Sequence, residues 1–232
     1  MNELKSTLSL HEWQQANQQR AAVYGWFSGL YAAELSDAGL KAWLSGAQDE
    51  WLLGLAGTGL TTQTQRLQAA VDCLRDVPHA HLELAADFAQ AFLLDAKTGA
   101  LPYGSCYKSE GAQFCGSSEQ RMRSFLEQSS LALQVDFKEP ADHLAIYLAV
   151  IVKLIEQQQQ GDMGTAVQAL DQAAFLKEGL MDWLPLFAEK CQGLTTRFDV
   201  YPALADLLLH FVQQDLMFLE DVAQEHFALS PR

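Results

Sequence analysis

Residues 144–160 read Leu-Ala-Ile-Tyr-Leu-Ala-Val-Ile-Val-Lys-Leu-Ile-Glu-Gln-Gln-Gln-Gln, and the first half of this stretch is apolar on every side. A helix that is apolar all round lies inside a core rather than on a surface. The unbroken apolar run, Leu144 to Val152, has nine residues, which is about half of what a helix needs to cross a membrane. The stretch therefore predicts a buried central helix of a globular protein, and Gly161 is expected to end it.

The rest of the chain has the same helical character. Apolar residues recur at steps of three and four positions, and no segment alternates for long enough to predict a strand. Ser9-Leu10-His11-Glu12 has the pattern of a capping box, in which the Ser and Glu side chains each bind a free backbone N–H at a helix start. Residues 54–59 are expected to form a loop. The pattern predicts an all-α, multi-helix bundle of about nine helices, at about residues 9–31, 36–44, 61–76, 82–93, 118–133, 144–160, 162–179, 182–192 and 202–226.

Two breaks interrupt the helical pattern. The first, between Asp95 and Ser118, holds four glycines and a proline, and a loop of this length in a compact domain usually has a function. The second, from Gln134 to Asp142, holds Pro140. We therefore expect two helical parts joined by a hinge: an N-terminal domain at 1–134, a hinge at 135–142 and a C-terminal domain at 143–232.

The chain is acidic. It has 29 acidic and 15 basic side chains in 232 residues, a net charge of −14 at pH 7. Residues 1–134 carry 14 acidic and 9 basic side chains (net −5), and residues 135–232 carry 15 and 6 (net −9). Such a charge repels nucleic acid and anionic membranes, so a natural partner is cationic. The six carboxylates between residues 198 and 231, where no Lys or Arg occurs, fit either a solvated surface or an electrostatic guide for a basic ligand.

The sequence also predicts a cytoplasmic protein. The first ten residues show no signal peptide, and no apolar run is long enough for stable membrane insertion. The four cysteines are far apart, without a Cys-x-x-Cys motif, so neither a zinc site nor a disulfide framework is expected.

Motifs for catalysis are absent from the sequence. The glycine-rich segments 99–104 and 111–116 lack the lysine of a phosphate-binding loop, and no glutamate has a histidine three residues later, as di-iron bundles require. Asp206 and His210 lie one helical turn apart, and a histidine satisfied by a carboxylate is favoured there over a metal site. We therefore expect no catalytic residue and no bound metal.

The two breaks contain the candidate binding residues. Residues 102–107 place two tyrosines and a serine on a glycine-containing loop, and such amphipathic rings often anchor peptides. At the second break, Asp142 can cap the following helix while His143 stays at the mouth of the site. Carboxylates are stabilised at a helix N-terminus, so capping alone would explain Glu139 and Asp142; recognition of a basic ligand is the other reading.

Both segments resemble a known family. Glu139-Pro140-Ala141-Asp142-His143-Leu144 resembles the Glu-Pro-x-Asp-His-Leu signature of the TorD/DmsD family of redox-enzyme maturation chaperones. Tyr103-Gly104-Ser105-Cys106-Tyr107 resembles the Tyr-x-Ser-Val-Tyr loop of that family, in the form of its TorD branch. With weaker similarity at Arg20, Tyr24 and Phe27, the resemblance covers about residues 20–150.

The resemblance implies a cytoplasmic chaperone rather than an enzyme. Its client would be a molybdoenzyme exported by the twin-arginine route, trimethylamine N-oxide reductase in its apo form, bound through its leader peptide and its folded body. The chaperone would keep the client open for the molybdenum cofactor, which belongs to the client, so the chain itself needs no cofactor. The resemblance also implies homodimers formed by exchange of domains across the hinge.

The leader of such a client is cationic at one end and apolar behind. We expect Asp142 and Glu139 to receive its arginines, Tyr103 and Tyr107 to hold its apolar segment, and a protonated His143 to oppose binding. The residues expected to bind the client are Tyr103, Gly104, Ser105, Tyr107, Glu139, Pro140, Asp142 and His143. The alternatives left open are an all-α enzyme or a nucleotide-hydrolysing protein with an unrecognised site, and a general interaction module.

Overall fold

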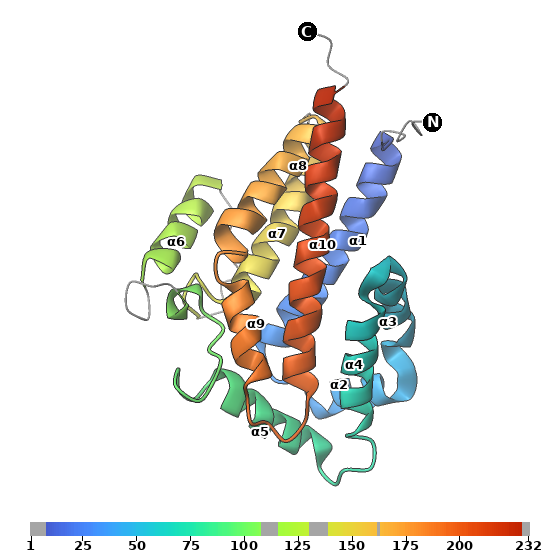
Figure 1. Ribbon diagram of the computed structural model, residues 1–232, viewed down its shortest axis with the longest axis vertical. Helices are drawn as coiled ribbons and strands as arrows, with labels where there is room; N and C mark the ends of the chain where they lie inside the picture. Colours follow the sequence, from blue (N-terminus) through green and yellow to red (C-terminus); the bar gives the residue numbers. More distant parts are fainter. Residues whose placement is uncertain (1–7, 108–115, 130–138, 162, 229–232) are drawn as a thin grey trace.

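The computed structural model describes residues 8–107, 116–129, 139–161 and 163–228, without the side chains of 225–228. These residues form an all-α bundle, as predicted (Figure 1). Half of the predicted hinge, residues 135–138, lies outside the described residues. The α-helices are α1 (Leu10–Ala32), α2 (Asp37–Ala42), α3 (Asp49–Leu55), α4 (Thr61–Asp72), α5 (Ala80–Phe92), α6 (Ser117–Ser129), α7 (Leu144–Gln159), α8 (Thr165–Ala174), α9 (Leu184–Gln192) and α10 (Val200–Ala228).

The apolar stretch that opened the sequence forms α7 and lies in the core. α7 packs along α1 and contacts α8, and α10 packs against α4, α8 and α9. In Figure 1, α1, α7, α8 and α10 run along the long axis, while α5 crosses one end of the bundle. One apolar core therefore includes helices from both predicted domains. The division into two domains at the hinge stays a prediction.

Helix starts and stops follow the local chemistry. The predicted capping box is confirmed, because Ser9 Oγ accepts a hydrogen bond from the backbone N–H of Glu12 while Glu12 Oε2 accepts from the N–H of Ser9 at 2.8 Å. Ser36 caps α2 in the same way through the N–H of Gly39. Each capped N–H is one that the helix itself leaves without a partner.

The predicted loop at residues 54–59 is wrong. Residues 49–55 are α3, and the chain continues through a wide helical turn, Ala56–Leu60, into α4. The change of direction occurs at Gly59, whose φ of 103° is accessible to glycine without steric cost. Gly46, with φ 92°, makes the same kind of bend between α2 and α3. At each of these glycines the chain changes direction within one residue, so no loop is needed there. α3 is therefore a helix in addition to the nine predicted.

A polar network is buried between α1, α8 and α10. Arg20 forms a two-point ion pair with Asp215, with Nε–Oδ1 at 2.5 Å and Nη2–Oδ2 at 2.9 Å, and Tyr24 donates its hydroxyl to Asp215 at 2.6 Å. The remaining Arg20 nitrogen, Nη1, donates to Asn17 and Gln172. A buried charge is tolerated only when it is paired and hydrogen-bonded, and this network fixes α1 against α8 and α10.

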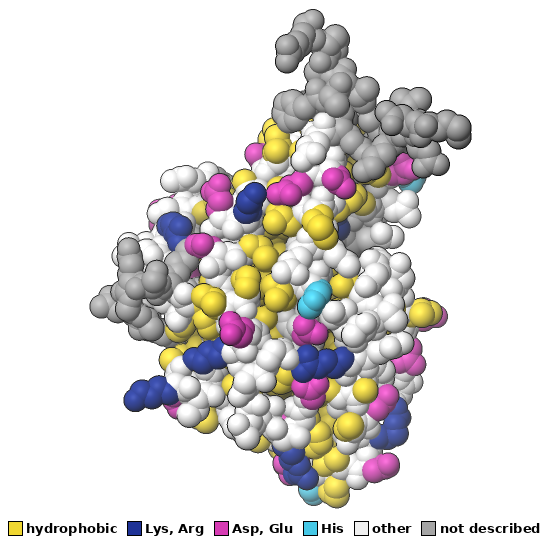
Figure 2. Space-filling view, viewed as in Figure 1, with side chains coloured by type: hydrophobic (Ala, Val, Ile, Leu, Met, Phe, Trp, Pro, Cys, Tyr) yellow, Lys and Arg dark blue, Asp and Glu magenta, His cyan; other side chains and the backbone are white. Residues whose placement is uncertain are grey.

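The acidic C-terminal stretch is largely paired. Asp199 and Asp206 both lie near Arg66, Asp215 pairs with Arg20, and Glu220 lies 3.4 Å from Lys177. Figure 2 shows acidic side chains spread over one face with basic ones among them, rather than one acidic patch. Helices distant in sequence therefore supply the basic partners that the stretch itself lacks, and the reading of this stretch as a simple solvated surface is incomplete.

No helix among the described residues is both long enough and apolar enough to span a membrane. Within the same residues, no cluster of three or more histidine, cysteine or carboxylate side chains has the arrangement of a metal site. Asp206 and His210 lie together as expected, with Nδ1–Oδ1 at 3.2 Å.

Candidate functional site

The two sequence motifs meet in space. Tyr103 and His143 form an isolated antiparallel bridge, and the N–H groups of Gly104 and Leu144 donate to the carbonyls of Asp142 and Pro102 at 3.0 and 2.7 Å. We call residues 102–107 together with residues 139–144 the junction. Backbone hydrogen bonds thus hold the loop after α5, in the predicted N-terminal domain, against the end of the predicted hinge and the start of α7.

Asp142 is the fully buried carboxylate of the junction. Its Oδ2 accepts a hydrogen bond from the N–H of Ser105 at 2.8 Å, while its Oδ1 has no partner among the described residues. The prediction that Asp142 caps the following helix is wrong. His143 is the cap of α7, with Nδ1 accepting from the N–H of Ala145 at 3.1 Å. The Asp142 carboxylate is turned to the tyrosine loop instead, because the backbone bridge places Ser105 directly beside it.

Tyr103 connects the buried and the exposed parts of the junction. Its hydroxyl donates to Glu139 Oε2 at 2.6 Å, and its ring lies edge-on to His143 with 5.0 Å between centroids. Burial, together with the Glu139 carboxylate, raises the pKa of Tyr103, so the phenol stays protonated and donates. Glu139 itself is exposed. Of the two carboxylates of the junction, that of Glu139 is the one open to solvent.

His143 does not have the charge that the pH-tuning hypothesis requires. Burial lowers its pKa to about 4, against a smaller opposing effect of the Glu139 carboxylate. The imidazole is therefore neutral between pH 5 and 8, and its observed role is to cap α7 and to pack against Tyr103.

Tyr107 packs inward rather than standing free. Its ring stacks on Trp183 at 5.8 Å with 16° between planes, and Trp183 in turn lies edge-on to Tyr147 of α7 at 5.7 Å. A Cβ atom added to Gly104 would lie 3.0 Å from Trp183 Nε1. Glycine therefore permits the loop to approach the indole, and Trp183 is a residue of this site that the sequence reasoning missed.

The structure brings all eight predicted residues together, but they differ in access. Tyr103, Gly104, Ser105, Asp142 and His143 are buried, Tyr107 and Pro140 are half-buried, and Glu139 is exposed. Several buried polar atoms in or beside the junction have no hydrogen-bond partner among the described residues, namely Ser105 Oγ, Tyr107 OH and Ser118 Oγ. Buried polar groups are normally paired, so the junction has spare capacity to donate and accept hydrogen bonds.

Comparisons with known proteins agree with these motifs. A family model described as "Nitrate reductase delta subunit" matches residues 56–189, more than half of the chain. A "Chaperone protein TorD" from Psychrobacter sp. (strain PRwf-1) is 40% identical over 215 residues, covering 92% of this chain and 97% of the relative. A protein of the same name from Vibrio cholerae is 37% identical over 216 residues, with 90% and 96% covered. Another from Photobacterium profundum is 36% identical over 209 residues, with 88% and 95% covered.

These relatives are named chaperones, which is a non-enzymatic role, and their similarity extends over most of the chain. The chain belongs to the TorD family. The predicted family, the all-α fold and the non-enzymatic role are thereby confirmed.

Proposed function

We propose that this protein is a cytoplasmic chaperone for the apo form of an exported molybdoenzyme, trimethylamine N-oxide reductase. It binds the twin-arginine leader and the body of the client, and it keeps the client competent for insertion of the molybdenum cofactor before export. The cofactor belongs to the client. Homodimers form by exchange of domains across residues 135–142.

One observation carries this proposal: the two motifs of the family resemblance form a single junction, with an exposed carboxylate above a buried one. Glu139 lies at the surface and is held by Tyr103, and Asp142 lies below and is held by Ser105. A structural cap alone would need neither the pairing of the two segments nor the hydrogen bond between Tyr103 and Glu139.

The chemistry of the junction suits a cationic peptide. A guanidinium group binds a carboxylate through two parallel hydrogen bonds, and Glu139 offers an exposed carboxylate whose Oε2 is oriented by the Tyr103 hydroxyl. The Asp142 carboxylate adds negative charge from a buried position, where electrostatic interactions are weakly screened. Glu139 is therefore the first contact for a leader arginine, and Asp142 acts through its charge and by holding the tyrosine loop.

Calorimetric titration with a synthetic twin-arginine leader of trimethylamine N-oxide reductase tests this function. We expect saturable binding that becomes about tenfold weaker when the leader arginines are replaced by alanine, and similarly weaker with Glu139→Gln or Asp142→Asn in the protein. Glu50→Gln, an exposed glutamate on α3, is the matched control and should bind as the unchanged protein does. If both junction variants are as stable as the unchanged protein and bind the leader with the same affinity, the leader does not bind at the junction. Absence of binding to both the leader and the whole apo-enzyme would refute the function.

A further inference from the structure

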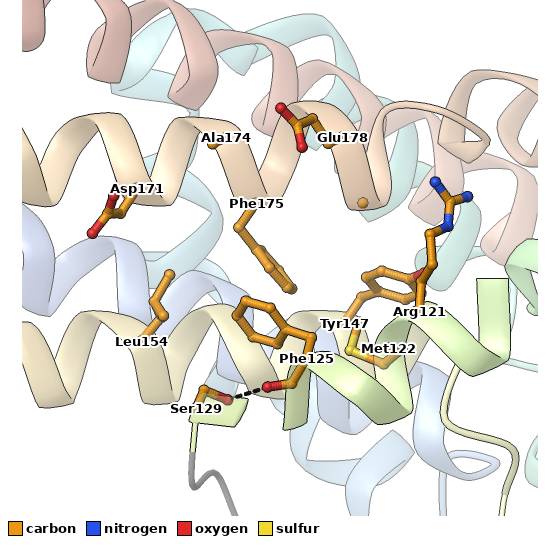
Figure 3. Close-up of a pocket in the computed structure, with 11 residues that line it drawn as sticks. Arg121, Met122, Phe125, Ser129, Tyr147, Leu154, Asp171, Ala174, Phe175 and Glu178 are labelled. Atoms are coloured by element: carbon orange, nitrogen blue, oxygen red, sulfur yellow. Dashed lines mark hydrogen bonds between the residues drawn. The ribbon is translucent and has the colours of Figure 1, made fainter. Parts of the chain in front are cut away.

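A groove lies beside the junction, between α6, α7 and α8 with the wide helical turn Phe175–Leu180 that follows α8. Its volume is about 430 Å³. Figure 3 shows Phe125 of α6 and Phe175 meeting in the middle of it, with 5.1 Å between their ring centroids, Tyr147 and Met122 at one end and Leu154 at the other. This size and lining are typical of a ligand site, in which apolar side chains form most of the surface.

The walls of the groove carry charge as well as apolar surface. Asp171 and Glu178, both exposed, belong to the wall formed by α8 and the turn after it. Glu178 has no ion-pair partner among the described residues, and Asp171 has only a 3.5 Å hydrogen bond from Gln158. The one basic residue of the lining, Arg121, lies 3.8 Å from Asp182. The groove therefore combines an apolar floor with a negative wall to which no basic side chain is paired in the part of the chain that the structure describes.

Aromatic contacts connect this groove with the junction. Tyr147 lines the groove and lies one turn along α7 from the cap His143. Its ring packs on Trp183, which stacks on Tyr107 of the junction. Trp183 is fully buried and Tyr147 nearly so, which means that these rings join the two features through the core. At the surface the groove and the junction are neighbours, because α6, which lines the groove, also contacts Gly104–Cys106 of the junction.

We propose that this groove binds the apolar segment of a client peptide, with its basic side chains beside Asp171 and Glu178. This deepens the proposed function and rests on it: the junction receives the arginines of the leader, and the groove receives the apolar residues that follow them. The occupant is chosen by its chemistry, because apolar residues match the apolar lining, a basic side chain at the edge of the segment is attracted to Asp171 and Glu178, and an acidic segment would be repelled.

A blocking variant and a charge variant test the two features separately. Ala174→Trp places a bulky ring in the groove from an exposed position, with Ala22→Trp at an exposed position of α1 as its matched control. The double variant Asp171→Asn with Glu178→Gln removes the negative wall, and Glu189→Gln on α9 is the control for a lost exposed carboxylate. The affinity of each protein for the twin-arginine leader and for the whole apo-enzyme is measured by calorimetry, and the oligomeric state by light scattering.

We expect Ala174→Trp to weaken leader binding about tenfold or more and the double charge variant to weaken it about threefold, with both controls unchanged. If the unchanged protein binds only the apo-enzyme, the same losses measured with the apo-enzyme support the groove. Equal affinities in all groove variants would overturn the groove and leave the junction standing. A changed oligomeric state without changed affinity would assign the groove to a second copy of the chain and also overturn it. If the unchanged protein binds neither the leader nor the apo-enzyme, both the proposed function and the proposed role of the groove are refuted.

Discussion

Replacement of Asp215 by alanine is expected to lower the free energy of unfolding by about 3–5 kcal/mol, the usual cost of removing one partner of a buried ion pair. Arg20 would keep its charge in the core, because Asn17 and Gln172 can solvate the guanidinium but cannot neutralise it. Tyr24 would also lose the acceptor of its hydroxyl. The measurement is urea-induced unfolding followed by circular dichroism at pH 7.

Two further variants distinguish the loss of the ion pair from a general effect of substitutions in α10 on stability. Asp221→Ala, at an exposed position of the same helix, should change stability by less than about 0.5 kcal/mol. The double variant Arg20→Met with Asp215→Leu should be more stable than Asp215→Ala alone, because it leaves no unpaired buried charge. A loss of under about 1 kcal/mol in Asp215→Ala would contradict the role of the network in holding α1 against α10.

Acidification from pH 7.5 to pH 5 is expected to remove about 2 kcal/mol of stability through His143 alone. Its pKa in the folded protein is about 4, below the ordinary 6.5, because burial disfavours the charged imidazole. Between those two values the unfolded chain binds a proton that the folded chain does not. The contribution of His143 is therefore complete above pH 6.5 and is lost as the pH falls toward 4.

His143→Asn isolates this effect, because asparagine can cap α7 through its side-chain oxygen but does not titrate. Unfolding curves at pH 7.5 and pH 5 give, for each protein, the stability lost on acidification. This loss should be about 2 kcal/mol smaller in the variant than in the unchanged protein. Equal losses in the two proteins would show that His143 titrates with an ordinary pKa and is not shielded from water in the folded protein.

Periodicity and caps were sufficient to predict most of the fold. The apolar run of α7, the capping box of α1 and the serine cap of α2 depend on residues close in sequence, so their chemistry is visible there. α3 was missed because its sequence, with Gly54 and the nearby glycines at 57 and 59, looks like a loop. Of these three glycines only Gly59 takes a positive φ, and Gly54 and Gly57 stay helical in a segment that packs against α4.

The site was predictable in its residues but not in its arrangement. The two motifs were visible as sequence patterns, whereas the bridge between Tyr103 and His143 depends on how two distant segments fold together. The position of Asp142 just before α7 predicted it as the cap of this helix. In the structure His143 is the cap, because the Asp142 carboxylate accepts a hydrogen bond from the N–H of Ser105 instead. Trp183 was missed because nothing near it in the sequence connects it with the tyrosine loop that it supports.

The most direct test of the chaperone function is reconstitution of the client. Apo-trimethylamine N-oxide reductase is incubated with molybdenum cofactor alone, with this protein, or with its Asp142→Asn variant, and the recovered reductase activity is measured over time. We predict that the unchanged protein raises the yield of active enzyme severalfold and that the variant, equally well folded, raises it less. Equal yields with and without the unchanged protein would contradict its role in maturation of this client.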